Sequence, residues 1–210
     1  MNKSFLVFLD AGHGALDAKG NYVTAPSKQF QHTQGVFHKG SWFYEGVWDR
    51  TLTNRVASKL TQLGIDHLIV SHEYLDTPLA YRVDMANWYA KRASKSLYIS
   101  NHANASGANA RGFEVYTTPG KTASDAVAEI HFNNVKELLG NRITMRSDTS
   151  DGDSDREANF YVIRKTVMPA FLVEHLFFDN FEDAKLLMDD EIVDLFAEAQ
   201  VRTIIQYMES

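Results

Sequence analysis

Three titratable side chains stand where apolar segments of the chain end. His13 follows the run 5–10 within the segment DAGHG, and His102 follows the run 96–100 within SNHANA. Glu174 comes directly after the run 169–173. Imidazole and carboxylate groups bind metals and transfer protons. Because ligands of α/β sheets bind at the carboxyl ends of the strands, these three positions are candidates for one site.

A fourth candidate, Glu45, stands at the start of a segment with helical periodicity. Two histidines and a carboxylate form many catalytic zinc sites, where a fourth tetrahedral position holds water. A second carboxylate that is not a ligand can accept the proton of that water. The glycines beside His13 are expected to let the backbone turn sharply and bring the imidazole to a metal.

Each of these residues also has an ordinary explanation. A single histidine is more often hydrogen-bonded or exposed than a ligand, Glu45 suits the first turn of any helix, and Glu174 suits a sheet edge. It is their joint occurrence at strand ends that indicates a metal site. The remaining histidines lack this context, and we expect them to be structural or solvated: His32, His38, His67, His72 and His131. His175, next to Glu174, should point to the opposite side of its strand, into the core or behind the site.

The elements that must position these residues alternate along the chain. Short apolar runs predict six strands, at 5–10, 67–71, 96–100, 113–117, 160–164 and 169–173. Helical periodicity predicts helices at 46–63, from a cap at Thr77 through Ala93, at 122–139, and in the last third of the chain through 192–207. Polar segments 101–112 and 145–159 are expected to be loops, the second one exposed.

This alternation predicts an α/β fold with a twisted, mostly parallel sheet of about six strands and helices on both faces. No internal repeat and no linker rich in Pro, Gly or Ser divides the sequence, so residues 1–210 are expected to form a single catalytic domain.

Composition excludes several classes of protein. The chain has 210 residues, 44% of them hydrophobic and 23% charged, which is typical of a globular domain. It has no cysteine, which excludes disulfides and thiolate metal sites. Its net charge of −6 and the lack of a basic block argue against a nucleic-acid partner. No apolar stretch approaches the length of a membrane span, so membrane insertion is not expected.

The N-terminus shows only five apolar residues, at 5–9, before Asp10. A signal peptide needs a longer apolar region and a cleavage site with small residues. The sequence therefore predicts a cytoplasmic protein without a signal peptide.

Three segments resemble the signatures of the zinc-dependent N-acetylmuramoyl-L-alanine amidases of the amidase-3 type: DAGHG at 10–14, SNHANA at 100–105 and FLVEHLFFDN at 171–180. Shorter similarities lie at 44–46, 79–82, 86–87, 112–116 and 160–163. The blocks follow the family's order over nearly the whole chain. The sequence departs from the family at Asn101, where an apolar residue is commoner, and at Ser71-His72, where Thr-Arg is frequent.

The resemblance implies a ligand set of His13, Glu45 and His102 for one Zn²⁺ per chain, with Glu174 as the catalytic carboxylate. Glu45 is separated from His13 by 31 residues, more than in most relatives, yet no other glutamate precedes Glu73. The implied reaction is hydrolysis of the amide between N-acetylmuramic acid and L-alanine of the peptidoglycan stem. Asp10 and Asn104 are expected to orient the ligating imidazoles or to cap turns.

The segment 15–44 carries six aromatic residues and three lysines against one aspartate. This aromatic, basic segment either stacks on sugar or peptide of the substrate and attracts the carboxylates of the stem peptide, or it packs its aromatics on the edge of the sheet. The compact, unsignalled domain resembles a phage or prophage lysin, which acts on the cell wall after release, and a monomer is expected. Two alternatives are a zinc-dependent carboxypeptidase acting on wall peptides and a non-catalytic wall-binding module, although the second should have lost a ligand or Glu174.

Overall fold

The computed structural model describes residues 4–210; residues 1–3, part of the N-terminal stretch considered above, lie outside this range. In chain order its elements are β1 (Phe5–Ala11), the 3-10 helix η1 (Pro26–Lys28), β2 (Gln29–Gln31), β3 (Trp42–Tyr44), α1 (Glu45–Gln62), β4 (His67–Ile69), α2 (Leu79–Ala90), β5 (Lys95–Asn104), β6 (Glu114–Thr117), α3 (Ala123–Leu139), β7 (Arg156–Glu157), α4 (Tyr161–Lys165), β8 (Ala170–Phe177), α5 (Phe181–Leu187) and α6 (Asp190–Glu209).

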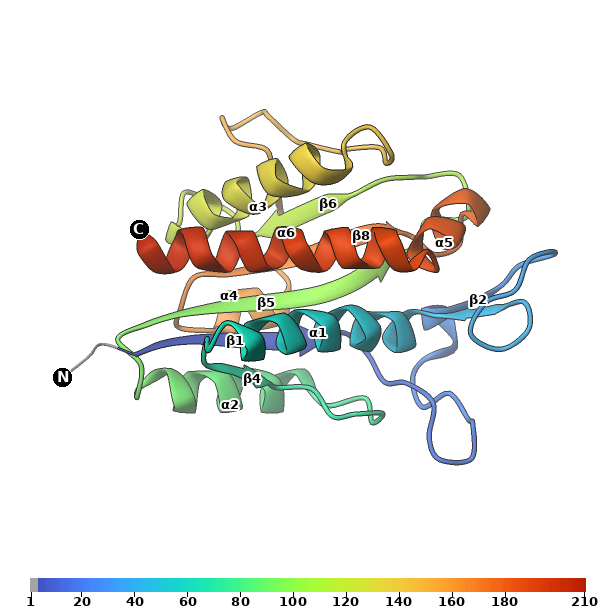
Figure 1. Cartoon of the computed structure of the whole chain (residues 1–210), viewed down its shortest axis with the longest axis horizontal. Helices are drawn as coiled ribbons and strands as arrows, with labels where there is room; N and C mark the ends of the chain where they lie inside the picture. Colours follow the sequence, from blue (N-terminus) through green and yellow to red (C-terminus); the bar gives the residue numbers. More distant parts are fainter. Residues whose placement is uncertain (1–3) are drawn as a thin grey trace.

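A six-stranded sheet with the order β4-β1-β5-β8-β6-β7 runs through the described residues (Figure 1). The strands β4, β1, β5 and β8 are parallel, β6 is antiparallel to β8, and β7 is parallel to β6. The predicted α/β fold with a mostly parallel sheet of about six strands is therefore confirmed.

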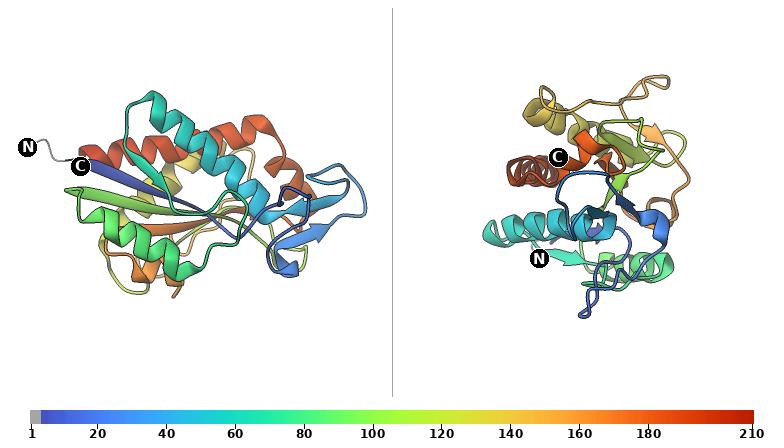
Figure 2. Two further views of the ribbon diagram at one scale, coloured as in Figure 1. Left: turned by 90° about the horizontal axis from the view of Figure 1, so that it is seen from below. Right: turned by 90° about the vertical axis from the view of Figure 1, so that its right-hand side faces the viewer.

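Helices cover both faces of this sheet, as Figures 1 and 2 show: α1, α3 and α6 on one face, α2 and α4 on the other. The alternation of side chains along the strands divides the core in the same way. Leu9 and Ile99 belong to the larger apolar cluster under α1 and α6, whereas Phe8 and Tyr98 belong to the smaller one under α2 and α4. No helix within residues 4–210 has the length and apolar character needed to cross a bilayer.

The strand predicted at 160–164 is wrong, because this segment forms the short helix α4. Its two consecutive side chains Val162 and Ile163 are both buried, a pattern that a strand with one covered face does not give. The sixth strand is β7 instead. It lies within the segment 145–159, which the sequence predicted as an exposed loop, and it pairs with the edge of β6.

The starts of α3 and α2 differ, and the cap predicted at Thr77 is wrong. Thr122 caps α3 as part of a capping box with Asp125. Thr77 does not cap α2: its hydroxyl accepts the amide hydrogen of His72 at 2.9 Å, and Pro78 occupies the cap position. Proline at this position has a fixed φ angle that suits the entry into a helix, so α2 begins without a side-chain cap.

The segment 15–44 forms a two-stranded hairpin, β2 and β3, that leads directly into α1. Phe37, Phe43 and Tyr44 are buried, and the ring of Phe43 stacks on that of Phe178 with centroids 5.7 Å apart. Of the two roles considered for the aromatics, packing against the end of the sheet is thus confirmed for these rings. The hairpin lies at the end of the molecule where β1, β5 and β8 terminate (Figure 1).

Candidate metal centre

The side chains of His13, Glu45 and His102 converge beyond the carboxyl end of β1. Nε2 of His13 and Nδ1 of His102 each lie 3.1 Å from Oε1 of Glu45, and the candidate ligand atoms of the three residues all lie within 4.8 Å of one another. The two imidazole rings are nearly perpendicular, with centroids 4.9 Å apart. The structure therefore brings together the three residues that the sequence predicted as ligands.

These donor atoms fit a metal ion. Two imidazole nitrogens and one carboxylate oxygen match zinc, and one tetrahedral position stays free. Glu45 is only 1% exposed, and among the described residues neither its Oε2 nor Nε2 of His13 has a hydrogen-bond partner. Buried polar atoms without partners are costly, and a cation between them would remove that cost.

The protonation states of the site also suit a metal. Burial raises the pKa of Glu45, but the neighbouring imidazoles of His102 and His13 outweigh it and lower the pKa to about 2. Burial lowers the pKa of His102, and Glu45 opposes this shift only in part. At neutral pH the site thus presents an ionised carboxylate and a neutral His102, the forms that coordinate metals.

The backbone of His13 is held in an unusual conformation by two buried arginines. His13 has φ of 54°, in the left-handed region that residues other than glycine rarely adopt, so the turn occurs at the histidine and not at the glycines beside it. Its carbonyl oxygen accepts hydrogen bonds from Nη2 of Arg50 at 2.7 Å and from Nη2 of Arg82 at 3.4 Å. These hydrogen bonds offset the free-energy cost of the left-handed conformation. They also fix the backbone from which the His13 side chain extends.

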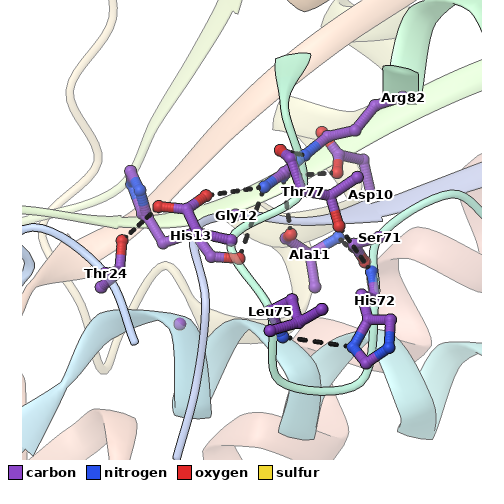
Figure 3. Close-up of polar contacts among 12 residues, drawn as sticks. Asp10, Ala11, Gly12, His13, Thr24, Ser71, His72, Leu75, Thr77 and Arg82 are labelled. Atoms are coloured by element: carbon purple, nitrogen blue, oxygen red, sulfur yellow. Dashed lines mark hydrogen bonds and ion pairs between the residues drawn. The ribbon is translucent and has the colours of Figure 1, made fainter. Parts of the chain in front are cut away.

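Of the two roles considered for Asp10, a hydrogen bond to a ligating imidazole is not found within residues 4–210; Asp10 instead acts on the site through Arg82. Its Oδ1 accepts from Nη1 of Arg82 at 2.8 Å (Figure 3). Its Oδ2 accepts from the hydroxyls of Tyr98 and Ser100. Asn104 likewise contacts no ligating imidazole within residues 4–210, since its amide donates to Glu114.

Close packing at glycines sets the distances between the elements of the site. A Cβ atom on Gly46, the second residue of α1, would lie 1.9 Å from the carbonyl oxygen of Gly14. A Cβ atom on Gly12 would lie 2.3 Å from Cε1 of His102. Because glycine lacks this atom, the start of α1 docks on the loop after β1, and His102 approaches the same loop.

Glu174 lies beside His102 in the sheet. Strand β5 continues to Asn104 and β8 to Phe177, so both residues lie inside strands, where His102 is in register with Glu174 and Glu174 with Glu114. Burial, followed by the charges of Glu45 and Glu114, raises the pKa of Glu174 well above its usual value, although Lys28 opposes them. Its Oε2 is buried without a partner among the described residues.

His175 points to the opposite face of β8, as predicted. It is buried against Trp48 and Phe196, with ring centroids 5.1 and 4.9 Å away. Its Nδ1 lies 3.1 Å from the carbonyl oxygen of His102, so His175 also contacts the backbone of β5, the strand that carries this proposed ligand.

The sequence predicted neither the contact of Lys28 with a proposed ligand nor a place for Asp49 in the site. Nζ of Lys28 lies 3.6 Å from Oε2 of Glu45, although the two are far apart in the chain. Asp49 is fully buried, one helical turn after Glu45, and neither of its carboxylate oxygens has a partner in the described part of the chain. The spacing of four residues could have placed Asp49 on the same helix face as Glu45. Nothing in the local sequence distinguishes Lys28 from Lys19 or Lys39.

Comparison with known protein families matches residues 7–206 to the family described as N-acetylmuramoyl-L-alanine amidase, Amidase_3. The chain belongs to this family. The match covers nearly the whole sequence and includes all four predicted site residues, which confirms the resemblance found in the signature segments.

Individual relatives agree with this membership. The chain is 28% identical over 209 residues to the endolysin of Bacillus phage SPP1, covering 98% of this chain and 66% of that protein. It is 26% identical over 192 residues to the N-acetylmuramoyl-L-alanine amidase CwlM of Bacillus licheniformis, covering 91% of this chain and 64% of that protein. Among solved structures, the amidase AmiC2 of Nostoc punctiforme superposes with a TM-score of 0.74 at 27% identity, covering 98% of each chain. The chain thus spans less than two thirds of the length of both curated relatives.

Proposed function

We propose that this chain is a peptidoglycan hydrolase that cleaves the amide between N-acetylmuramic acid and L-alanine of the stem peptide. The observation that carries the proposal is the convergence of His13, Glu45 and His102 at the carboxyl edge of the sheet, with Glu174 next to His102. Membership in the amidase family supports the choice of substrate.

In this proposal His13, Glu45 and His102 hold one Zn²⁺ per chain. When bound, zinc polarises the amide carbonyl and lowers the pKa of its water toward about 7. Glu174 accepts the proton of the attacking water and passes it to the departing amine. Its raised pKa makes it a stronger base than an exposed glutamate, which suits proton transfer near neutral pH. All four groups come from one chain, so a monomer is sufficient.

The likeness to the SPP1 endolysin supports a role as a lysin that reaches the wall after release from the cell that makes it. A wall substrate, and no nucleic acid, also agrees with the net charge of −6, because binding to nucleic acid depends on a basic surface.

The proposal is tested by digesting purified sacculi with the protein, with and without a chelator, and analysing the soluble products by mass spectrometry. An amidase releases intact stem peptides with a free L-alanine amino group and leaves glycan with lactyl ends. The chelator should abolish this release, and added zinc should restore it.

Two other results would each reject the amidase assignment. Shortened stem peptides that remain attached to glycan would identify a carboxypeptidase. Protein that sediments with the sacculi but releases nothing, with zinc present, would identify a binding module.

A further inference from the structure

The ammonium group of Lys28 is the cation nearest to the proposed ligands among the ion pairs of the described chain. It lies 3.6 Å from Oε2 of Glu45, the carboxylate oxygen on the side away from the two imidazoles. Burial raises the pKa of both Glu174 and Asp49, and Lys28 lowers them, so its charge also acts on these two carboxylates. Lys28 thus stands at the wall of the site with its charge directed inward.

The position of Lys28 is fixed by its backbone and does not depend on the ion pair. The hydroxyl of Tyr22 donates to the carbonyl oxygen of Lys28 at 2.8 Å and accepts the amide hydrogen of Gly46 at 3.1 Å. The ring of Tyr22 also packs on that of Tyr44, with centroids 4.7 Å apart. The next residue, Gln29, is paired with Tyr44, immediately before Glu45. The hairpin therefore ties Lys28 to the first turn of α1.

Metal binding changes the partner that Lys28 needs. Without a metal, its ammonium offsets the charge of Glu45. Once Glu45 serves as a ligand, a dication offsets that charge instead and repels the ammonium, since unit charges a few ångströms apart interact by about 1 kcal/mol or more. The Lys28 side chain is 37% exposed, so it is free to turn away from Glu45. It then lacks an anionic partner in a site where the reaction moves negative charge from Glu174 to the carbonyl oxygen of the substrate.

We propose that Lys28 is a catalytic residue whose ammonium donates a hydrogen bond to the oxyanion of the tetrahedral intermediate. This inference rests on the proposed function. The water oxygen forms a bond to the amide carbon, the π electrons of the carbonyl move to its oxygen, and the water proton passes to Glu174. Lys28 keeps its own protons throughout. When the carbonyl re-forms, the C–N bond breaks and the amine takes the proton from Glu174.

The oxyanion is the partner that the geometry favours. The carbonyl must lie beside Glu45 and Glu174 to react, and the ammonium of Lys28 lies 3.6 Å from the carboxylate of Glu45. A hydrogen-bond donor directed at charge that appears only in the transition state increases the rate by a factor of about 10²–10³. If Lys28 instead bound a carboxylate elsewhere on the substrate, its ammonium would not need to lie beside Glu45.

Lys28→Met removes the charge and keeps an unbranched side chain, Lys28→Arg keeps the charge, and Lys19→Met removes a charge from the same segment away from the ligands. Initial rates on a soluble muramoyl-peptide should show kcat about 100-fold lower for Lys28→Met, with KM changed less than about threefold. Lys28→Arg should recover part of this loss, and Lys19→Met should match the wild type. Zinc should bind Lys28→Met at least as tightly as the wild type, because a repelling cation is gone.

A second measurement does not depend on turnover. Calorimetry with the zinc-loaded protein compares a phosphinate analogue of the scissile amide, which carries the tetrahedral anion, with a neutral ketone isostere. Lys28→Met should lose affinity for the phosphinate by about the same factor as kcat and keep its affinity for the neutral compound.

Three outcomes would overturn the inference: an unchanged kcat, a change in KM alone, which would mark Lys28 as a binder of a substrate carboxylate, or equal losses for both analogues. If the wild type does not cleave the muramoyl–alanine amide, the proposed function fails, whereas the contrast between the two analogues still tests Lys28 by itself.

Discussion

At the scale of single residues, the site is prepared for a metal by its protonation states. His102 is buried with a lowered pKa, and Glu45 stays ionised down to a pKa of about 2. His13→Ala and His102→Ala should therefore each lose bound zinc and activity, because two remaining ligands hold zinc weakly against water. Metal analysis of the purified variants measures this. His67→Ala, at the far edge of the sheet, is the matched control, and full occupancy in either ligand variant would contradict the assignment.

Glu174 is expected to act without holding the metal. Glu174→Gln keeps the shape of the side chain but cannot accept a proton, so turnover should fall by about 100-fold or more while zinc stays bound. The same change removes a buried carboxylate whose pKa is raised by burial and by Glu45, so the metal-free variant should be at least as stable as the wild type at pH 7. Rates, metal content and urea denaturation check these points together, with exposed Glu73→Gln as control. A near-normal rate would require a different base.

At the scale of elements, the end of β1 is joined to α1 and α2 by the two buried arginines. Arg82 is 1% exposed and reaches from α2 to Asp10, which is 0% exposed, and to the carbonyl oxygens of Ala11 and His13. Arg50 reaches from α1 to the carbonyl oxygens of Gly12 and His13. A metal ligand thus depends on contacts between three elements.

Arg82→Met should leave the Asp10 carboxylate buried without its cation and lower the free energy of unfolding by about 3–5 kcal/mol. The variant should also bind zinc more weakly, since the carbonyl oxygen of His13 loses one of its two arginine donors. Urea denaturation measures the first effect and zinc titration at low temperature the second. Arg92→Met, just after α2, is the control because Arg92 stacks on the ring of Trp88 at the surface. Equal stability of the two variants would contradict the role of the Asp10–Arg82 pair.

At the scale of the whole molecule, buried histidines outside the metal site make stability depend on pH. Burial lowers the pKa of His131 to about 3 and that of His175 well below its usual value. The unfolded chain binds protons near pH 6.5 and the folded protein does not, so this stability is complete above pH 6.5 and decreases as the pH falls. At pH 5 this costs about 2 kcal/mol for His131, and His175 acts in the same direction. His131→Gln should remove about 2 kcal/mol from the difference in unfolding free energy between pH 7.5 and pH 5, whereas partly exposed His67→Gln should not.

Asp155 acts in the opposite direction. Burial raises its pKa to about 7; the hydrogen bond from Thr117 opposes this shift, and the neighbouring Asp153 adds to it. Its folded pKa lies above the unfolded value near 3.9, so the stability it contributes is complete below that value and is lost as the pH rises toward 7. Asp155→Asn should raise the melting temperature at pH 8 more than at pH 5. A larger rise at pH 5 would contradict this sign.

The sequence by itself determined the elements whose pattern is long and the residues whose chemistry is specific. Eighteen residues of α1 and twenty of α6 repeat their apolar positions over several turns, so burial of one face decides their structure whatever lies opposite. His13, His102 and Glu174 could be assigned because parallel strands bring their carboxyl ends to one edge. Glu45 needed the family resemblance, since a glutamate in a first helical turn is common.

The tertiary structure alone decided the short elements and the contacts between distant segments. The five residues of α4 and the two of β7 are too few for a period to show, and their conformation follows from what packs against them. Lys28 enters the site only because the hairpin and Tyr22 tie it to the start of α1. The left-handed turn at His13 likewise depends on Arg50 and Arg82, which lie 37 and 69 residues away. Local propensity cannot encode such contacts, because their free energy is gained only when the elements meet.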